Sequence, residues 1–154
     1  MKVHEDFPDI TSPKTMLPPL KYIANKAEIK KLEDAPNLKQ ALDMFWLETT
    51  GSHDRARKAI QHYYNRVQNA NFYFTSYYEG WKTDRGMIYI VYGPPTSMLK
   101  DADTEIWNYG EAGNMNSIKF TFRRVGSVYA DNDFRLERSA LYKSSWLDAI
   151  NILR

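Results

Sequence analysis

Three carboxylic acids near the middle of the chain have the residue type that glycoside chemistry needs. Asp84 follows Glu79 closely in the sequence, and Glu105 comes from the segment downstream. Two carboxyl groups that face one cleft can act as acid and base on a glycosidic bond. An ion pair of Asp84 with Arg66 or Arg85 would instead hold the carboxylate in its charged form, unable to donate a proton. We favour the ion pair and assign no catalytic residue; a carbohydrate-active enzyme with paired carboxylates is the alternative.

Aromatic residues are abundant, at 14% of the chain. Flat rings that are exposed together bind sugars or peptide side chains. The opposite interpretation is an aromatic core under a loop, which we favour because soluble proteins rarely expose large apolar patches. If a binding surface exists, its candidate residues are Tyr77, Tyr78, Trp81, Trp107 and Tyr109.

The residues do not favour other chemistry. The chain has no cysteine, which excludes disulfides, thiolate catalysis and cysteine-type zinc sites. The spacing of His53 and His62 places them on opposite faces of a helix, so they cannot share a metal ion. No G-x-S-x-G motif accompanies the serines, and Gly93-Pro94-Pro95-Thr96 lacks the lysine of a phosphate-binding loop. We therefore predict no metal and no cofactor.

Charge and hydropathy limit the partners. The net charge is only +2, and no run of Lys and Arg is present, so the sequence does not indicate nucleic-acid binding. No run of about 18 apolar residues could span a membrane. The first residues, MKVHEDFPDI, lack the apolar core of a signal peptide. Either the protein is cytoplasmic, or Met1 is the artificial start of an excised piece.

The first half of the chain has the periodicity of helices. Residues 1–20 carry four of the seven prolines and are predicted to form an extended arm or linker, followed by a single domain over residues 21–154. We expect a mildly helical segment over 21–32. A helix from Leu38 should end at Gly51, and a longer one should carry an apolar stripe from Ala56 to Phe74, capped by Ser52 or Asp54.

The second half has the pattern of a sheet. An apolar run at 87–92 predicts a central strand that ends at Gly93-Pro94-Pro95. Strands at 104–109 and 117–124 predict an antiparallel hairpin, and shorter strands are expected at 127–130 and 134–137. A short terminal helix fits the spacing of Ser145 and Asp148, which is that of a capping box.

The stretch Glu79-Gly80-Trp81-Lys82-Thr83-Asp84-Arg85-Gly86 joins these two halves. We expect Gly80 to adopt a φ that side chains forbid, Trp81 to anchor the loop on the core, and Asp84, with Thr83, to accept backbone N–H groups in a tight turn. The predicted structural motif therefore comprises Gly80, Trp81, Thr83, Asp84, Arg85 and Gly86, with Arg66 as a partner. Its role would be to lock the long helix onto the first strand.

The run EGWKTDRGMIYIVYGPP resembles the signature of the GWxTD domain, a bacterial family named for Gly80, Trp81, Thr83 and Asp84. The flanks are similar as well: Phe45-Trp46, Tyr64-x-Arg66-Val67, Glu105-Ile106-Trp107-x-Tyr109 and Phe120-x-Phe122. Such domains usually lie at the C-terminal end of larger exported proteins. The resemblance implies that this chain is a fragment of a protein of the cell envelope or periplasm, and it supplies no activity, cofactor or catalytic residue.

We therefore expect an α+β fold, with two or three N-terminal helices packed on an antiparallel sheet of four or five strands and a short C-terminal helix. The expected function is that of a non-enzymatic interaction module of a larger cell-envelope protein. Its partner would be a protein or a cell-wall glycan.

Overall fold

The computed structural model describes residues 12–111, 113–126 and 132–154. In chain order, the elements are α1 (Pro13–Met16), the 3-10 helix η1 (Pro18–Tyr22), α2 (Lys26–Glu33), α3 (Leu38–Thr50), α4 (His53–Phe74), the 3-10 helix η2 (Gly80–Lys82), α5 (Asp84–Tyr92), β1 (Ser97–Lys100), β2 (Thr104–Tyr109), β3 (Ile118–Arg124), β4 (Phe134–Leu136) and α6 (Tyr142–Leu153). Helices and one antiparallel sheet together give the α+β class that the sequence predicts.

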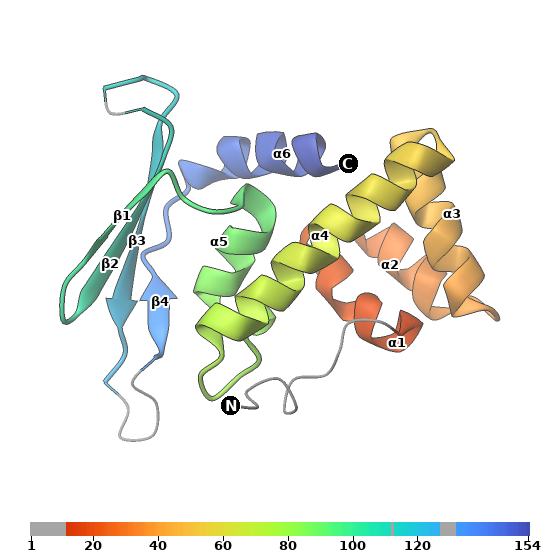
Figure 1. Ribbon diagram of the computed structural model, residues 1–154, viewed down its shortest axis with the longest axis horizontal. Coiled ribbons are helices and arrows are strands. Elements are labelled where there is room, and N and C mark those ends of the chain that lie inside the picture. Colours follow the sequence, from red (N-terminus) through yellow and green to blue (C-terminus); the bar gives the residue numbers. More distant parts are fainter. Residues whose placement is uncertain (1–11, 112, 127–131) are drawn as a thin grey trace.

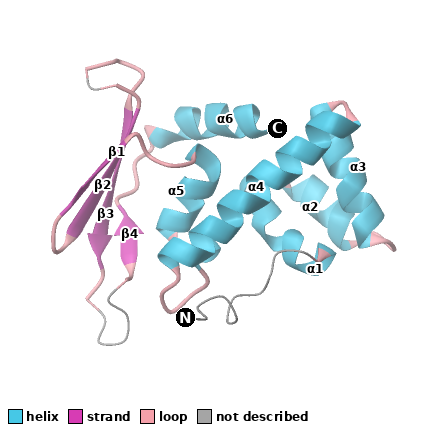
Figure 2. Cartoon of the chain, in the orientation of Figure 1, coloured by secondary structure: helices cyan, strands magenta, loops and turns pink. Residues whose placement is uncertain are grey.

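The elements are arranged in layers. The sheet stands at one end of the molecule, α5 and α6 lie beside it, and the long helix α4 separates them from α1, α2 and α3 (Figure 1). All helices lie on one side of the strands (Figure 2). The prediction that the N-terminal helices pack on the sheet does not hold for α1–α3, because α3 packs on α4 and both α1 and α2 pack on α3.

Helices α3 and α4 form where the sequence predicts them. The side chain of Asn37 accepts the Gln40 N–H at the start of α3, and Gly51 ends the helix with a φ of +81°, a left-handed conformation that glycine adopts without strain. Ser52, one of the two predicted caps, accepts the Arg55 N–H at the start of α4. On the buried side, Trp46 of α3 packs against Tyr63 and Tyr64 of α4.

The segment before α2 is not an extended arm where the structure describes it. Residues 13–22 form α1 and η1, and Leu20 is fully buried. The hydroxyls of Tyr63 and Tyr64 donate to the carbonyl oxygens of Pro19 and Met16, which ties this segment to α4. The prolines are compatible with helical structure here, because α1 begins at Pro13 and η1 begins at Pro18. The first turn of a helix does not use the backbone N–H that proline lacks. The helix expected from residue 21 begins only at Lys26, behind a capping box of Asn25 and Glu28.

The predicted strand at 87–92 is wrong, because these residues belong to helix α5. Apolar side chains are buried on nearly every face of α5, because the helix lies between α4 and the sheet. A short buried run has the same hydrophobic pattern in a helix as in a central strand. The signature therefore lies between two helices, rather than between a helix and a strand, and its residues 84–86 form the first turn of α5.

The sheet has four strands in the order β1-β2-β3-β4, all antiparallel. The expected hairpin of 104–109 and 117–124 is confirmed as β2 and β3, with Trp107 opposite Phe120. The strand expected at 134–137 is present as β4, and the strand expected at 127–130 lies outside the described residues. No pattern in the sequence indicates β1, which forms an edge of the sheet.

The terminal helix α6 is longer than expected and begins before Ser145. Its N-cap position is Leu141, which provides no side-chain hydrogen bond. Ser145 instead lies inside the helix, where its hydroxyl is 2.9 Å from that of Tyr92 on α5. Tyr142 packs on Phe120 of the sheet, so α6 closes the end of the core above α5.

Candidate functional site

Two glycines of the signature allow three backbone segments to touch. A Cβ on Gly80 would lie 1.9 Å from the carbonyl oxygen of Ala70 on α4. A Cβ on Gly86 would lie 1.8 Å from the carbonyl oxygen of Gly80. The prediction that Gly80 adopts a forbidden φ is wrong, because the glycines with positive φ in the described part of the chain are Gly51, Gly93, Gly110 and Gly113. Gly80 is needed for close approach instead.

Trp81 anchors the loop on the core, as predicted, and is 7% exposed. Its backbone N–H donates to Oδ1 of the buried Asn71 on α4, at 2.9 Å. Its indole Nε1 donates to Glu79, and its carbonyl oxygen accepts the hydroxyl of Tyr22 at 2.7 Å. Burial, with a smaller effect of Asp84, raises the pKa of Tyr22 to about 12. Every polar group of Trp81 is thus used within the domain.

Thr83 accepts a backbone N–H in the turn, as predicted, whereas Asp84 does not. Thr83 is the N-cap of α5: its hydroxyl accepts the Gly86 N–H at 3.0 Å and donates to the carbonyl oxygen of Gly80 at 2.7 Å. Asp84 is the first residue of α5 and reaches across to the sheet, where one carboxylate oxygen accepts the Leu136 N–H. The other oxygen accepts from Arg138, so the predicted pairing of Asp84 with Arg66 or Arg85 is wrong.

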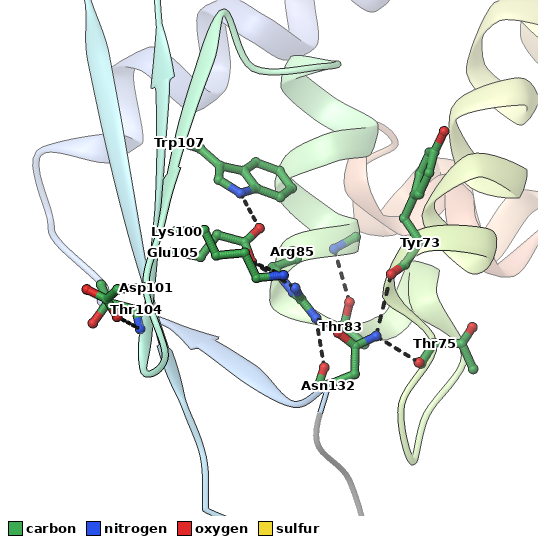
Figure 3. Close-up of polar contacts among 11 residues, drawn as sticks. Tyr73, Thr75, Thr83, Arg85, Lys100, Asp101, Thr104, Glu105, Trp107 and Asn132 are labelled. Atoms are coloured by element: carbon green, nitrogen blue, oxygen red, sulfur yellow. Dashed lines mark hydrogen bonds and ion pairs between the residues drawn. The ribbon is translucent and has the colours of Figure 1, made fainter.

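Arg85 makes the most deeply buried ion pair in the described part of the chain, with Glu105 on β2 (Figure 3). The two side chains are 4% and 2% exposed, and Nη1 of Arg85 lies 3.1 Å from Oε2 of Glu105. Burial lowers the pKa of Arg85, and the Glu105 carboxylate acts in the opposite direction. The indole of Trp107 donates to the other oxygen of Glu105, and Arg85 also donates to Asn132. This pair fixes α5 against the sheet.

Arg66 binds the C-terminal end of α5. Its Nη1 donates to the carbonyl oxygens of Ile90 and Val91, which have no partner within the helix. A positive charge at a helix C-terminus is favourable. The guanidinium also lies so close to Gly93 that a Cβ there would be 2.7 Å from Nη2. Arg66 therefore positions α5 at its C-terminal end, and Thr83, Asp84 and Arg85 position it at its N-terminal end.

The three carboxylates of the glycosidase hypothesis each have partners within the protein. Glu79 accepts from Trp81 and Lys82, Asp84 from Leu136 and Arg138, and Glu105 from Arg85 and Trp107. The domain has a groove of about 650 Å³ between α4, α5 and α6, and a cavity of about 470 Å³ between α2 and α3. None of the three carboxylates lines either of them.

The predicted binding residues separate into exposed and buried groups. Tyr77 and Tyr78 are 78% and 60% exposed. Trp107 is fully buried against Phe74 and Phe122. Trp81 is buried too, and Tyr109 is half-buried with its hydroxyl bonded to the carbonyl oxygen of Gly93. The structure therefore does not bring the five predicted side chains together on one surface.

Two further aromatic side chains accompany Tyr77 and Tyr78. Phe72 and Tyr73, in the last turn of α4, are 54% and 55% exposed and pack edge to face. We call Phe72, Tyr73, Tyr77 and Tyr78 the aromatic ledge. Sequence signals for Phe72 and Tyr73 are their position close to Tyr77 and their place outside the apolar stripe of the helix, which includes Ala70 and Phe74.

The backbone that carries the aromatic ledge is anchored to the signature. The Thr75 hydroxyl donates to the carbonyl oxygen of Asn71 at 2.6 Å and accepts the Gly80 N–H at 3.1 Å. The side-chain amide of Asn132 donates to the carbonyl oxygen of Thr75 at 3.1 Å (Figure 3). The loop between α4 and η2 is therefore held at both ends by buried or half-buried groups.

Metal ligation and membrane insertion have no evident basis in the described part of the chain. No group of three His, Asp or Glu side chains in residues 12–111, 113–126 and 132–154 is placed to hold a metal ion. No helix within these ranges is both long enough and apolar enough to cross a bilayer.

Comparison with known proteins identifies one family. No curated protein and no solved structure matches the chain. The family model of the GWxTD domain matches residues 1–154, which is the whole chain. The residues that name this family, Gly80, Trp81, Thr83 and Asp84, are those that join α4, α5 and β4 in the structure. The chain belongs to the GWxTD domain family.

Proposed function

We propose that this domain is a non-enzymatic interaction module of a larger cell-envelope protein and that it binds a protein partner through the aromatic ledge. The observation that carries the proposal is the exposure of Phe72, Tyr73, Tyr77 and Tyr78, each more than half open to solvent. The cell-envelope setting is supported by the family resemblance alone.

Exposed tyrosines of this kind are favourable in interfaces. A tyrosine offers a large apolar face together with a hydroxyl, and aromatic residues are enriched at the centres of protein interfaces. Exposed apolar surface that is gathered in one place costs solubility, so it usually marks an interaction site. The four exposed rings form two contacting pairs, Phe72 with Tyr73 and Tyr77 with Tyr78, that lie within seven residues of the chain. Other exposed apolar side chains, such as Met115 and Leu141, lie in other segments.

The anchored backbone supports binding further. Ordering a loop on binding costs free energy, and a loop that is already fixed avoids most of that cost. Thr75 and Asn132 hold the loop between the two aromatic pairs, and Asn71 and Gly80 connect it to the signature. The signature thus has a role in recognition, because it supports the surface that binds.

A protein partner fits the ring geometry better than a glycan. The Tyr77 and Tyr78 rings meet at 85°, and the Phe72 and Tyr73 rings at 81°. Perpendicular rings in contact present an uneven surface to a partner, and apolar and aromatic side chains of a protein can pack against both the edge and the face. Sugar rings stack on a flat aromatic face, and each of these pairs presents an edge beside a face.

The test uses the 154-residue domain immobilised and exposed to cell-envelope extract of its host. We expect the double variant Tyr77→Ser/Tyr78→Ser to retain a specific bound protein at least about tenfold less, since interface aromatic residues contribute more than about 1 kcal/mol each. Leu141→Ser is the matched control, because Leu141 is 85% exposed in another segment. Equal retention by the double variant and the wild type would refute the proposal. Selective co-sedimentation with peptidoglycan would point to a glycan partner instead.

A further inference from the structure

Strand β1 is an edge strand that is exposed along its whole length. It is first in the strand order β1-β2-β3-β4, and Ser97, Met98, Leu99 and Lys100 are all exposed. We propose that β1 pairs antiparallel with β1 of a second copy of this chain, so that the two four-stranded sheets become one continuous sheet across a two-fold axis. The pairing uses no residue of the aromatic ledge, and it does not depend on the function proposed above.

The backbone of β1 has groups available for such pairing. Asp101 donates its N–H to the carbonyl oxygen of Thr104, so this pair is hydrogen-bonded. Along an antiparallel ladder, hydrogen-bonded pairs alternate with non-hydrogen-bonded pairs. Lys100 with Glu105 is therefore a non-hydrogen-bonded pair, and Leu99 with Ile106 is the next hydrogen-bonded pair. The N–H and C=O groups of Met98 and Lys100 therefore point away from β2. An edge with outward donors and acceptors is a template for another strand.

The sequence of β1 is compatible with its own copy in one register. When Leu99 lies on the two-fold axis, Met98 faces Lys100 of the second copy, and each such pair exchanges both backbone hydrogen bonds. Asp101 then faces Ser97, so no like charges are directly opposite. A register centred on Lys100 would place two ammonium groups against each other, which is destabilising. This self-complementarity is the reason to expect a second copy rather than an unrelated peptide.

The side chains also favour this register. Leu99 is 64% exposed and lies beside Ile106 on the open face of the sheet. Across the axis, Leu99 would meet its own copy in a non-hydrogen-bonded pair, where side chains approach most closely. The result is an apolar row of Ile106, Leu99 and their two copies. Lys100 does not block the edge, because its ammonium points toward Glu105, 4.0 Å away, on the other face.

A strand of four residues gives a small interface, so dimerisation should depend on concentration. Sedimentation velocity on the 154-residue chain should show a reversible monomer–dimer equilibrium. Leu99→Lys should leave only monomer at every concentration, since it places two charges on the axis. Met115→Lys is the control, because Met115 is fully exposed on a loop, and it should dimerise as the wild type does. A wild-type chain that is monomeric at all concentrations would overturn the proposal.

Cross-linking tests the register. The chain has no cysteine, so in the purified protein a single introduced cysteine can pair only with its copy. In the proposed register the two Leu99 Cα atoms lie about 4.5 Å apart, within the range that a disulfide spans. Leu99→Cys should therefore form a disulfide dimer in the folded state much faster than Met98→Cys or Met115→Cys. Equal rates for all three, faster cross-linking at Met98, or attachment of Leu99→Cys to a different protein in cells would each contradict the proposal.

Discussion

The carbonyl oxygen of Gly80 lies 1.8 Å from the point where a Cβ on Gly86 would stand. This closeness lets η2 pack directly on the first turn of α5, and Thr83 completes the contact by bonding to both glycines. The signature of the family is thus first of all a packing device. Its glycines make the contact possible, its threonine caps the helix, and its aspartate attaches that helix to β4.

Adding one methyl group at either glycine should disrupt the fold. Helix propensity alone would favour Gly86→Ala by about 1 kcal/mol. We expect the opposite sign, a loss of at least about 3 kcal/mol in the free energy of unfolding, because backbone atoms cannot move aside as side chains can. Gly80→Ala should be similarly damaging. Gly126→Ala is the control, since a Cβ on Gly126 would have no atom within 4 Å. Urea denaturation measures all three, and an unchanged midpoint for Gly86→Ala would contradict the packing role.

The Thr83 hydroxyl should account for a measurable part of the stability. Thr83→Val keeps the shape but removes the cap to Gly86 and the bond to Gly80, so we expect a loss of about 2 kcal/mol. Thr83→Ser keeps both hydrogen bonds and should lose far less. The comparison of the two variants by thermal and urea unfolding separates the hydroxyl from the methyl group. Equal losses would show that the hydroxyl does not stabilise the helix start.

The buried pair of Arg85 and Glu105 should behave as a coupled unit. Arg85→Met leaves a buried carboxylate without its guanidinium and should cost about 3 to 5 kcal/mol. Glu105→Gln keeps an acceptor for Trp107 but removes the charge, and the double variant should be less destabilised than the sum of the two by about 1 to 3 kcal/mol. Lys100→Met is the control, because Lys100 is 62% exposed and 4.0 Å from Glu105. A double-mutant cycle without coupling would contradict the ion pair.

Stability should fall in alkaline solution through the buried tyrosines. The pKa of Tyr22 is raised to about 12 from an ordinary value of 10.0, and burial also raises that of Tyr64 and Tyr109. A tyrosine whose pKa is higher in the folded than in the unfolded state contributes to the free energy of unfolding. This contribution is fully present below pH 10 and is lost as the pH rises from there toward 12. Tyr22→Phe should cost about 1 kcal/mol at neutral pH, through the lost bond to Trp81, and should make the alkaline decline less steep. Denaturant titrations between pH 8 and pH 11 measure both effects, and a free energy of unfolding that stays constant across this range would refute the assignment.

Local patterns predict much of the fold. The stripe of α4, the αL glycine after α3 and the alternation in β2 and β3 each follow from the sequence within one element. Helix α5 is not predicted, because its β-branched and aromatic residues are buried on nearly every side and no polar face reveals the helical period. Strand β1 is not predicted, because its side chains are exposed on both faces and show no alternation.

The candidate site is harder to predict, because its contacts join distant parts of the chain. Asp84 pairs with Arg138 and Arg85 with Glu105, and nothing in the sequence near Asp84 or Arg85 specifies either partner. The burial of Trp81 follows from its place in the signature. The exposure of Tyr77 and Tyr78 beside it depends on how Thr75 and Asn132 fix the loop. Aromatic residue type alone does not distinguish a core ring from a binding surface.

The most direct measurement is site-specific photo-crosslinking of this protein in its host. A benzophenone amino acid would replace Tyr77 in the aromatic ledge and, as a control, Leu141, which is similarly open to solvent. We expect a discrete cross-linked protein at position 77, lost when Tyr78→Ser and Phe72→Ser are added, and none at position 141. No cross-link at position 77, or the same product at both positions, would contradict recognition through the aromatic ledge.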